Sequence, residues 1–172
     1  MSHKLLSSMC LTAALLLGGT HVASARPVSE VLVKQSTRGV KESIDALVQA
    51  VEAAGAKVVA RVDHAAGAKA VGTDMRPSEV LIFGNPKLGT PLIQANPRTG
   101  LDLPMRVLVY EDAAGKVWIV TTRPTTLKAR YGIKGRDEVF AAMSGALDKL
   151  TGTAAGTTVA PAIAPPAAPA KK

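Results

Sequence analysis

Both ends of the chain have compositions that cannot contribute to a folded core, and they confine the fold to the residues between them. Residues 1–25 carry Lys4 near the start, then an apolar stretch, then Ala23-Ser24-Ala25, which is the pattern of a cleaved secretory signal. Residues 151–172 are rich in Ala, Pro, Thr and Gly, so they bury too little apolar surface to offset the entropy of ordering. We therefore expect a signal peptide over 1–25, a single domain over 26–150 and a disordered tail over 151–172.

Removal of the signal would change the chemistry available to the mature protein, because Cys10 and two of the three histidines lie within it. His64 is then the sole histidine and no cysteine remains. These losses exclude a disulfide, a thiolate nucleophile and a cysteine-based metal site within one chain. We therefore predict no metal site and can specify no cofactor.

The signal also predicts where the protein resides. Its apolar core from Leu11 to Gly19 is shorter than the roughly 20 apolar residues that span a bilayer. We therefore expect cleavage rather than anchoring, no transmembrane segment after cleavage, and a periplasmic or secreted protein.

The charge balance favours an anionic partner. The formal net charge is +8, and it falls by one when Lys4 is removed with the signal. In an exported protein such a surplus suits anionic lipid, cell-wall polymer or a small anionic ligand. Nucleic acid is not favoured, because aromatic residues make up only 3% of the chain and do not alternate with basic ones.

Short β-branched runs and amphipathic stretches alternate along the central residues. The spacing of apolar residues predicts helices over 37–55 and 139–150, and an alanine-rich segment predicts a short helix over 64–70. Strands joined by tight turns, with helices before and after them, favour an α+β fold. We expect a small antiparallel or mixed sheet with helices packed mainly on one face. The predicted strands cover 28–36, 56–63, 78–83 and a hairpin of 106–111 with 116–122.

The middle of the chain concentrates residues that a core does not require. Gly84-Asn85-Pro86 follows a predicted strand and reads as a sharp turn in which glycine supplies conformational freedom. Gly89-Thr90-Pro91 then predicts a helix start, with Thr90 as N-cap. The free N–H groups of that start, together with Lys87, form a candidate anion site. A nucleotide-hydrolysing P-loop is not favoured, because Thr90 replaces the lysine that should follow the second glycine.

These segments resemble the family catalogued as domain of unknown function 302. That family has a strand ending in Asp-His before alanines, an apolar strand running into FGNPxxGTPL, a DLP segment and a Trp-containing hairpin. The resemblance covers roughly Val31 to Tyr131 and departs from the pattern at Ile93, where methionine is expected. It implies a fold type and no established activity. The matching segments are Asp63-His64-Ala65-Ala66, Leu81–Pro86, Gly89–Leu92, Asp102-Leu103-Pro104 and Val117-Trp118.

The sequence leaves several hypotheses open for the role of the His64 side chain. It could act as a general acid–base group oriented by Asp63 or Asp102. It could be an axial ligand of a haem or metal, with Met75, Met105 or a partner chain as the second ligand. It could also cap the following helix or satisfy a buried carbonyl, just as Asp102 could serve only a turn.

Three functions therefore remain open from the sequence. The first is a binding module of the cell envelope for a small ligand or anion, in which a homodimer is a further candidate partner. The second is an acid–base enzyme with His64, Asp63 and Asp102 as catalytic candidates. The third is a structural or dimerisation domain without a ligand. The candidate ligand-binding residues are His64, Gly84, Asn85, Lys87, Gly89, Thr90 and Asp102.

Overall fold

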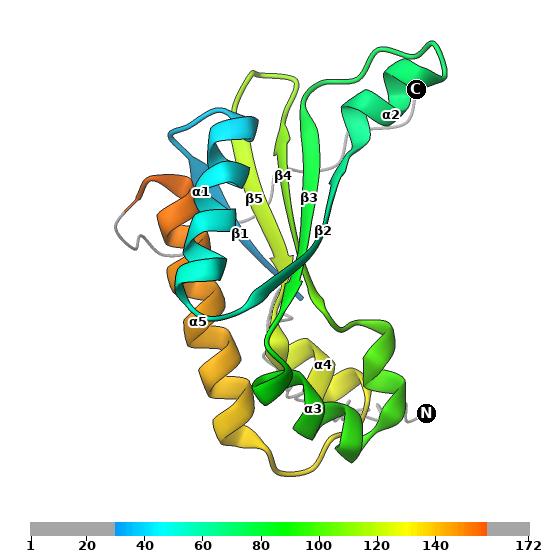
Figure 1. Ribbon diagram of the computed structural model, residues 1–172, viewed down its shortest axis with the longest axis vertical. Coiled ribbons are helices and arrows are strands. Elements are labelled where there is room, and N and C mark those ends of the chain that lie inside the picture. The colour runs from blue at the N-terminus through cyan, green and yellow to red at the C-terminus, as the bar shows by residue number, and fades with distance from the viewer. Residues whose placement is uncertain (1–29, 158–172) are drawn as a thin grey trace, which may run out of the picture.

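The computed structural model describes residues 30–157. Within this part of the chain, five strands form one antiparallel sheet that is flanked by helices (Figure 1). The predicted signal over 1–25 and the tail after residue 157 lie outside the described residues. No helix among the described residues is long and apolar enough to cross a membrane.

Within the described residues the chain begins with a strand, and helices follow between the strands and after the last one. The strands are β1 (Val31–Ser36), β2 (Lys57–Asp63), β3 (Ser78–Gly84), β4 (Met105–Glu111) and β5 (Val117–Thr122). The helices are α1 (Val40–Ala53), α2 (His64–Ala70), α3 (Pro86–Ala95), the 3-10 turn η1 (Pro97–Leu101), α4 (Pro124–Arg130) and α5 (Asp137–Ala155).

The sheet has the strand order β1-β5-β4-β3-β2, and every neighbouring pair is antiparallel. The predicted α+β fold is confirmed, and of the two sheet types expected the antiparallel one is observed. The second to fifth strands lie within one residue of their predicted bounds. The first was predicted from residue 28 and begins at Val31. The short helix α4 was not predicted.

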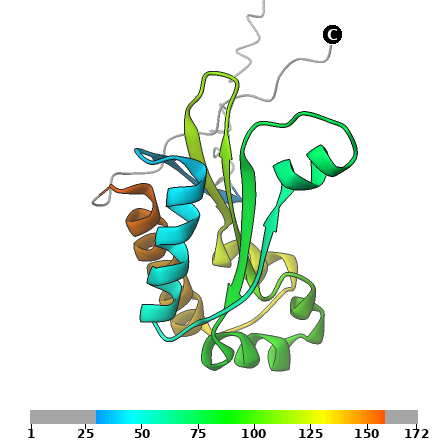
Figure 2. The same cartoon turned by 45° about the horizontal axis from the view of Figure 1, so that its top comes forward.

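The core lies between one face of the sheet and the pair α1 and α5. Figure 2 shows both helices on the same side of the sheet. In α1 the side chains of Ile44, Leu47 and Val51 are fully buried, at the helical spacing read from the sequence. Alternate strand residues such as Leu81 and Val107 meet them from the sheet. The predicted packing of helices mainly on one face follows from this arrangement.

The end of α5 corrects the predicted boundary of the tail. Disorder was expected from Thr151, but α5 continues to Ala155, and Thr151, Ala154 and Ala155 are buried. Backbone and side-chain donors before α1 hold this end of the helix: Thr37 N–H donates to the Ala155 carbonyl at 3.0 Å, and Arg38 Nη1 donates to the Thr153 carbonyl at 2.6 Å. Small residues bury little surface each but let a helix approach its neighbours closely. The average composition of 151–172 therefore gave no sign that its first five residues belong to α5.

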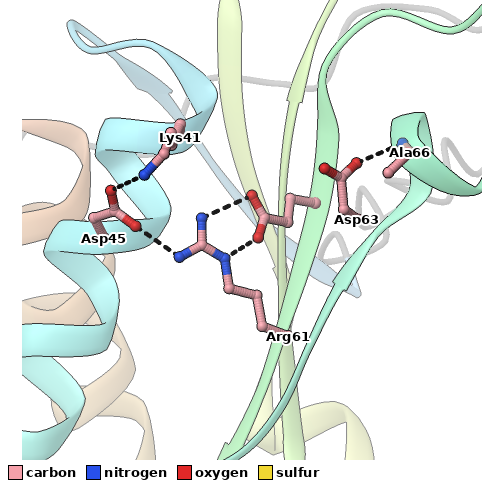
Figure 3. Close-up of polar contacts among 6 residues, drawn as sticks. Lys41, Asp45, Arg61, Asp63 and Ala66 are labelled. Atoms are coloured by element: carbon pink, nitrogen blue, oxygen red, sulfur yellow. Dashed lines mark hydrogen bonds and ion pairs between the residues drawn. The ribbon is translucent and has the colours of Figure 1, made fainter.

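An ion network fastens the edge strand β2 to α1 (Figure 3). The Arg61 guanidinium binds both carboxylate oxygens of Glu79, which is 7% exposed, and its Nη1 lies 2.6 Å from Asp45 Oδ1. Lys41 Nζ lies 2.8 Å from the other Asp45 oxygen. Hydrogen bonds to Glu79 and then Asp45 raise the pKa of Arg61, and those from Lys41 and then Arg61 lower the pKa of Asp45.

Packing of the last turns of α5 can be tested by enlarging a buried alanine. Ala154→Leu should lower the free energy of unfolding by about 1–3 kcal/mol, because Ala154 is fully buried and the added atoms must displace neighbours. The matched variant Thr153→Leu, at an exposed position of the same turn, should change it by less than about 0.5 kcal/mol. Equal effects in urea denaturation would show that residues after Leu150 do not pack.

The ion network predicts that its central member matters most. Arg61→Met should lower the free energy of unfolding by about 1–3 kcal/mol, because it leaves the buried Glu79 carboxylate without its partner. Lys41→Met removes an exposed partner of Asp45 and should cost less than about 1 kcal/mol. Thermal unfolding at neutral pH measures both variants. A larger loss for Lys41→Met than for Arg61→Met would contradict this view of the network.

Candidate functional site

The junction between β3 and α3 differs from the sequence prediction. The helix begins at Pro86, four residues before the predicted N-cap Thr90, which instead lies exposed within α3. Asn85 is the N-cap: its backbone is extended, and its Oδ1 accepts a hydrogen bond from Lys87 N–H at 3.0 Å. Pro86 occupies the first helical position, where a missing N–H costs nothing. Asn85-Pro86 is therefore the true start signal, and Pro91 lies inside the helix.

The same hydrogen bonds remove the predicted anion cradle. Besides Lys87 N–H, the amides of Leu88 and Gly89 donate to the Asn85 carbonyl at 2.9 and 3.0 Å. The first turn of α3 therefore has no free amide between residues 87 and 89 to offer an anion. The Lys87 side chain is exposed on the helix. The anion-binding role expected of these N–H groups is not supported by this geometry.

Gly84 is required for close packing rather than for an unusual backbone conformation. Its φ does not lie in the left-handed region, which corrects the expectation from the sequence. A Cβ added at Gly84 would lie 3.2 Å from Cβ of Pro104, tighter than ordinary side-chain contacts. A Cβ at Gly89 would lie 3.8 Å from Leu103 Cδ1. The glycine motif and the Asp-Leu-Pro segment, which are separate in sequence, therefore pack against each other.

These two segments form the wall of a cavity of about 420 Å³. The other walls come from the turn between α1 and β2, the start of β4 and the middle of α5, all in the lower half of the molecule in Figure 1. The lining residues are Ala54, Ala56, Lys57, Val59, Phe83, Gly84, Asn85, Pro86, Leu88, Gly89, Thr90, Ile93, Leu103, Pro104, Met105, Met143, Ala146, Leu147 and Leu150.

The chemistry of the cavity is almost wholly apolar. Of its lining residues only Lys57, Asn85 and Thr90 have polar side chains. Val59 is 61% exposed and Ile93 37% exposed, so the cavity opens to solvent beside them. Its volume falls in the range of small-molecule sites, which are mostly apolar with few polar groups. Four of the predicted ligand-binding residues, Gly84, Asn85, Gly89 and Thr90, therefore line a pocket whose walls suit mainly apolar groups.

His64 does not belong to this cavity. It is the exposed first residue of α2, and its side chain makes no hydrogen bond or ion pair with any residue between 30 and 157. The helix cap is Asp63, whose Oδ1 accepts from Ala66 N–H at 2.8 Å (Figure 3). Lys57 pairs with Gly84 at the cavity end of β2, whereas His64 follows the other end, roughly 20 Å away at the rise of an extended strand. The predicted grouping of His64 with the glycine motif is wrong.

Asp102 likewise does not contact His64, because three other side chains bind its carboxylate. Its carboxylate accepts hydrogen bonds from Tyr131 Oη at 2.6 Å, Arg130 Nη1 at 2.8 Å and Arg106 Nη2 at 3.2 Å. The hydrogen bond from Tyr131 and, to a lesser extent, that from Arg130 lower the pKa of Asp102. The Tyr131–Asp102 bond also raises the pKa of Tyr131. Asp102 thus ties η1 to α4, and it is not available to orient His64.

Sequence reasoning missed the residues that the rest of the fold brings to the cavity. Met143 and Leu147 were recognised only as the apolar face of the last helix, and Lys57 and Val59 only as strand residues. An apolar side chain has the same sequence pattern whether it lines a core or a cavity, so no signal distinguished them. Among residues 30–157 no group of three or more His, Cys, Asp or Glu side chains is placed to hold a metal ion.

Comparison with protein-family models gives a match over residues 32–150 to "Domain of unknown function DUF302". The chain belongs to the DUF302 family. A crystal structure of the uncharacterized conserved protein DUF302 from Bacillus stearothermophilus superposes with a TM-score of 0.67. The two share 20% sequence identity, over 74% of this chain and 99% of that one. This likeness shows that the DUF302 fold is common to both.

Curated relatives of this DUF302 chain carry the name of a channel. This chain is 41% identical over 105 residues to fluoride-specific ion channel FluC 1 of Brucella suis biovar 1, and it has the same identity to FluC 1 of Brucella abortus biovar 1. The aligned segment covers 61% of this chain but only 41% and 39% of those relatives. The chain thus matches less than half of the length of each of these relatives.

The carboxylate cluster predicts a pH-dependent stability. Asp102→Asn should lower the free energy of unfolding by about 1–2 kcal/mol at neutral pH. The neutral amide cannot form the charge-assisted hydrogen bonds that the carboxylate accepts from Tyr131 and Arg130. Folding lowers the pKa of Asp102, so its contribution is present above the unfolded value of about 3.9 and is lost as pH falls through the folded value.

Urea denaturation between pH 7 and pH 2.5 measures this effect. The gap between the wild type and Asp102→Asn should stay constant down to about pH 5 and shrink below about pH 4. Asp137→Asn, at a carboxylate that is 75% exposed, serves as the control and should show little gap at any pH. A gap for Asp102→Asn that persists unchanged at pH 2.5 would rule out the carboxylate as its source.

Proposed function

We propose that this protein is a binding module of the cell envelope whose cavity holds a small, mainly apolar ligand. The observation that carries the proposal is the convergence of the glycine motif, Gly84 to Thr90, and the segment Leu103-Pro104 on one apolar cavity. A structural domain needs such segments only for turns. Here both line a space of about 420 Å³.

The lining supports an apolar ligand on energetic grounds. Transfer of apolar surface from water into such a cavity is favourable by about 25 cal/mol per Å² buried. Met105 and Met143 lie in the wall, and the flexible thioether side chain lets a site adapt to ligands of different shape. The cavity therefore suits a class of related apolar molecules better than one rigid compound.

The alternative functions gain no comparable support. Acid–base catalysis requires a carboxylate or nucleophile near His64, and within residues 30–157 no hydrogen bond or ion pair links that side chain to one. Fluoride transport belongs to the names of relatives more than twice as long as the shared segment. An envelope location rests on the signal pattern of residues 1–25 and is part of the proposal.

The proposal predicts that filling the cavity abolishes binding. Ala146 lines the cavity from α5, and Ala142 is exposed one turn earlier on the same helix. Binding of the neutral fluorescent probe N-phenyl-1-naphthylamine is measured for the wild type, Ala146→Phe and Ala142→Phe. The wild type and Ala142→Phe should bind the probe equally. Ala146→Phe should bind it at least about tenfold more weakly, which corresponds to a loss of about 1.4 kcal/mol of binding free energy.

Circular dichroism and thermal unfolding establish that Ala146→Phe is folded before its binding is judged. Native mass spectrometry of the protein purified from its own envelope fraction identifies any ligand that copurifies. Unchanged probe binding by folded Ala146→Phe, or failure of the wild type to bind the probe at all, would refute the proposed site.

A further inference from the structure

One charged side chain lines the apolar cavity, and it is a cation. Lys57 begins the edge strand β2, opposite Gly84 in the ladder, and it is exposed. Among the described residues it forms no ion pair or side-chain hydrogen bond, whereas Arg61 farther along the same strand is bound by two carboxylates. No Asp or Glu lines the cavity. Lys57 is therefore the one charged residue of the lining, and its long, exposed side chain can bring the ammonium to a molecule bound in the cavity.

The start of α3 adds to this positive potential. Asn85 and Pro86 line the cavity, so the N-terminal turn of this ten-residue helix borders it. The positive end of the helix dipole lies at that turn. The amides of Lys87, Leu88 and Gly89 are already bonded to Asn85, so the turn contributes an electrostatic potential and not direct hydrogen bonds. Asn85 Oδ1 already accepts a hydrogen bond from Lys87 N–H, so its side-chain amide nitrogen is the group that can donate to a ligand.

These features discriminate among ligand classes. A wholly apolar ligand would cover Lys57 and the Asn85 amide without replacing the hydrogen bonds they make to water, which carries a cost. A cationic head would be repelled. An anionic head gains a charge-assisted hydrogen bond to the ammonium while its chain lies among the apolar walls. A single cation matches a head with a single negative charge, which favours a carboxylate over a doubly charged phosphate monoester.

From this we infer that the cavity binds single-chain aliphatic carboxylates, with the chain against the apolar walls and the carboxylate at Lys57 beside Asn85. The inference rests on the proposed function and specifies its ligand. The surplus of positive charge over the whole chain, formally +8, attracts the same class of molecule.

The test compares two ligands of equal chain length. Decanoate and decanol are titrated calorimetrically at pH 8 and low salt, below their aggregation concentrations, into the wild type, Lys57→Met and Lys87→Met. Lys87 is a matched control, because it is exposed on α3 near the cavity but does not line it. The wild type and Lys87→Met should bind decanoate roughly tenfold more tightly than decanol. Lys57→Met should lose this preference and keep its affinity for decanol.

The outcomes separate this inference from the proposed function. Binding of decanol with no preference for decanoate in the wild type would overturn the inference and leave the apolar site intact. A preference that survives in Lys57→Met would overturn it as well. Failure of the wild type to bind either ligand would overturn both. Lys57→Arg should retain the preference, which a purely structural role of the side chain would not predict.

Discussion

Packing of α1 against the sheet and against its neighbour α5 is the contact on which the rest of the structure depends. Ile44, Leu47 and Val51 are fully buried there, and the two helices run antiparallel, so that the start of α1 lies at the end of α5. Yet α1 has 14 residues and α5 has 19, about 21 and 28 Å at the rise of a helix. Where α1 ends, α5 extends past it and contacts α3 and α4 instead. The cavity lies there, among α5, α3 and the turn that follows α1.

Local patterns were sufficient to predict most of the fold. Helical spacing located α1, and Gly55, the last residue of the predicted range, follows the helix in the left-handed conformation typical of a helix end. The failures arose where two local signals competed or where the average composition misled. Thr90-Pro91 and Asn85-Pro86 are both good helix starts by sequence, and the structure uses Asn85-Pro86, next to the close packing of Gly84 against Pro104. Thr151 belonged by composition to the tail, but it is buried through contacts distant in sequence.

The candidate site was predicted in part, because its members are joined by pairing rather than by sequence. Phe83 and Met105 are partners in the β3–β4 ladder, which brings the segments after one and before the other together. Sequence reasoning selected both segments but could not place them against each other or against α5. It grouped His64 with them among the candidate ligand-binding residues, but the length of the extended strand β2 separates His64 from them. The anion site first expected at the amides of the glycine motif thus gave way to a mostly apolar cavity with Lys57 in its lining.

The weak anchoring of α3 affects how the cavity could fill. Among its residues only Leu92 is buried, in contrast to the many buried side chains of α1 and α5. Segments with few buried contacts open at a small fraction of the free energy of global unfolding. Excursions of α3 would admit a molecule while the paired helices and the sheet keep their hydrogen bonds. In hydrogen exchange the protection of α3 amides would then report occupancy, and that of α1 amides the stability of the whole domain.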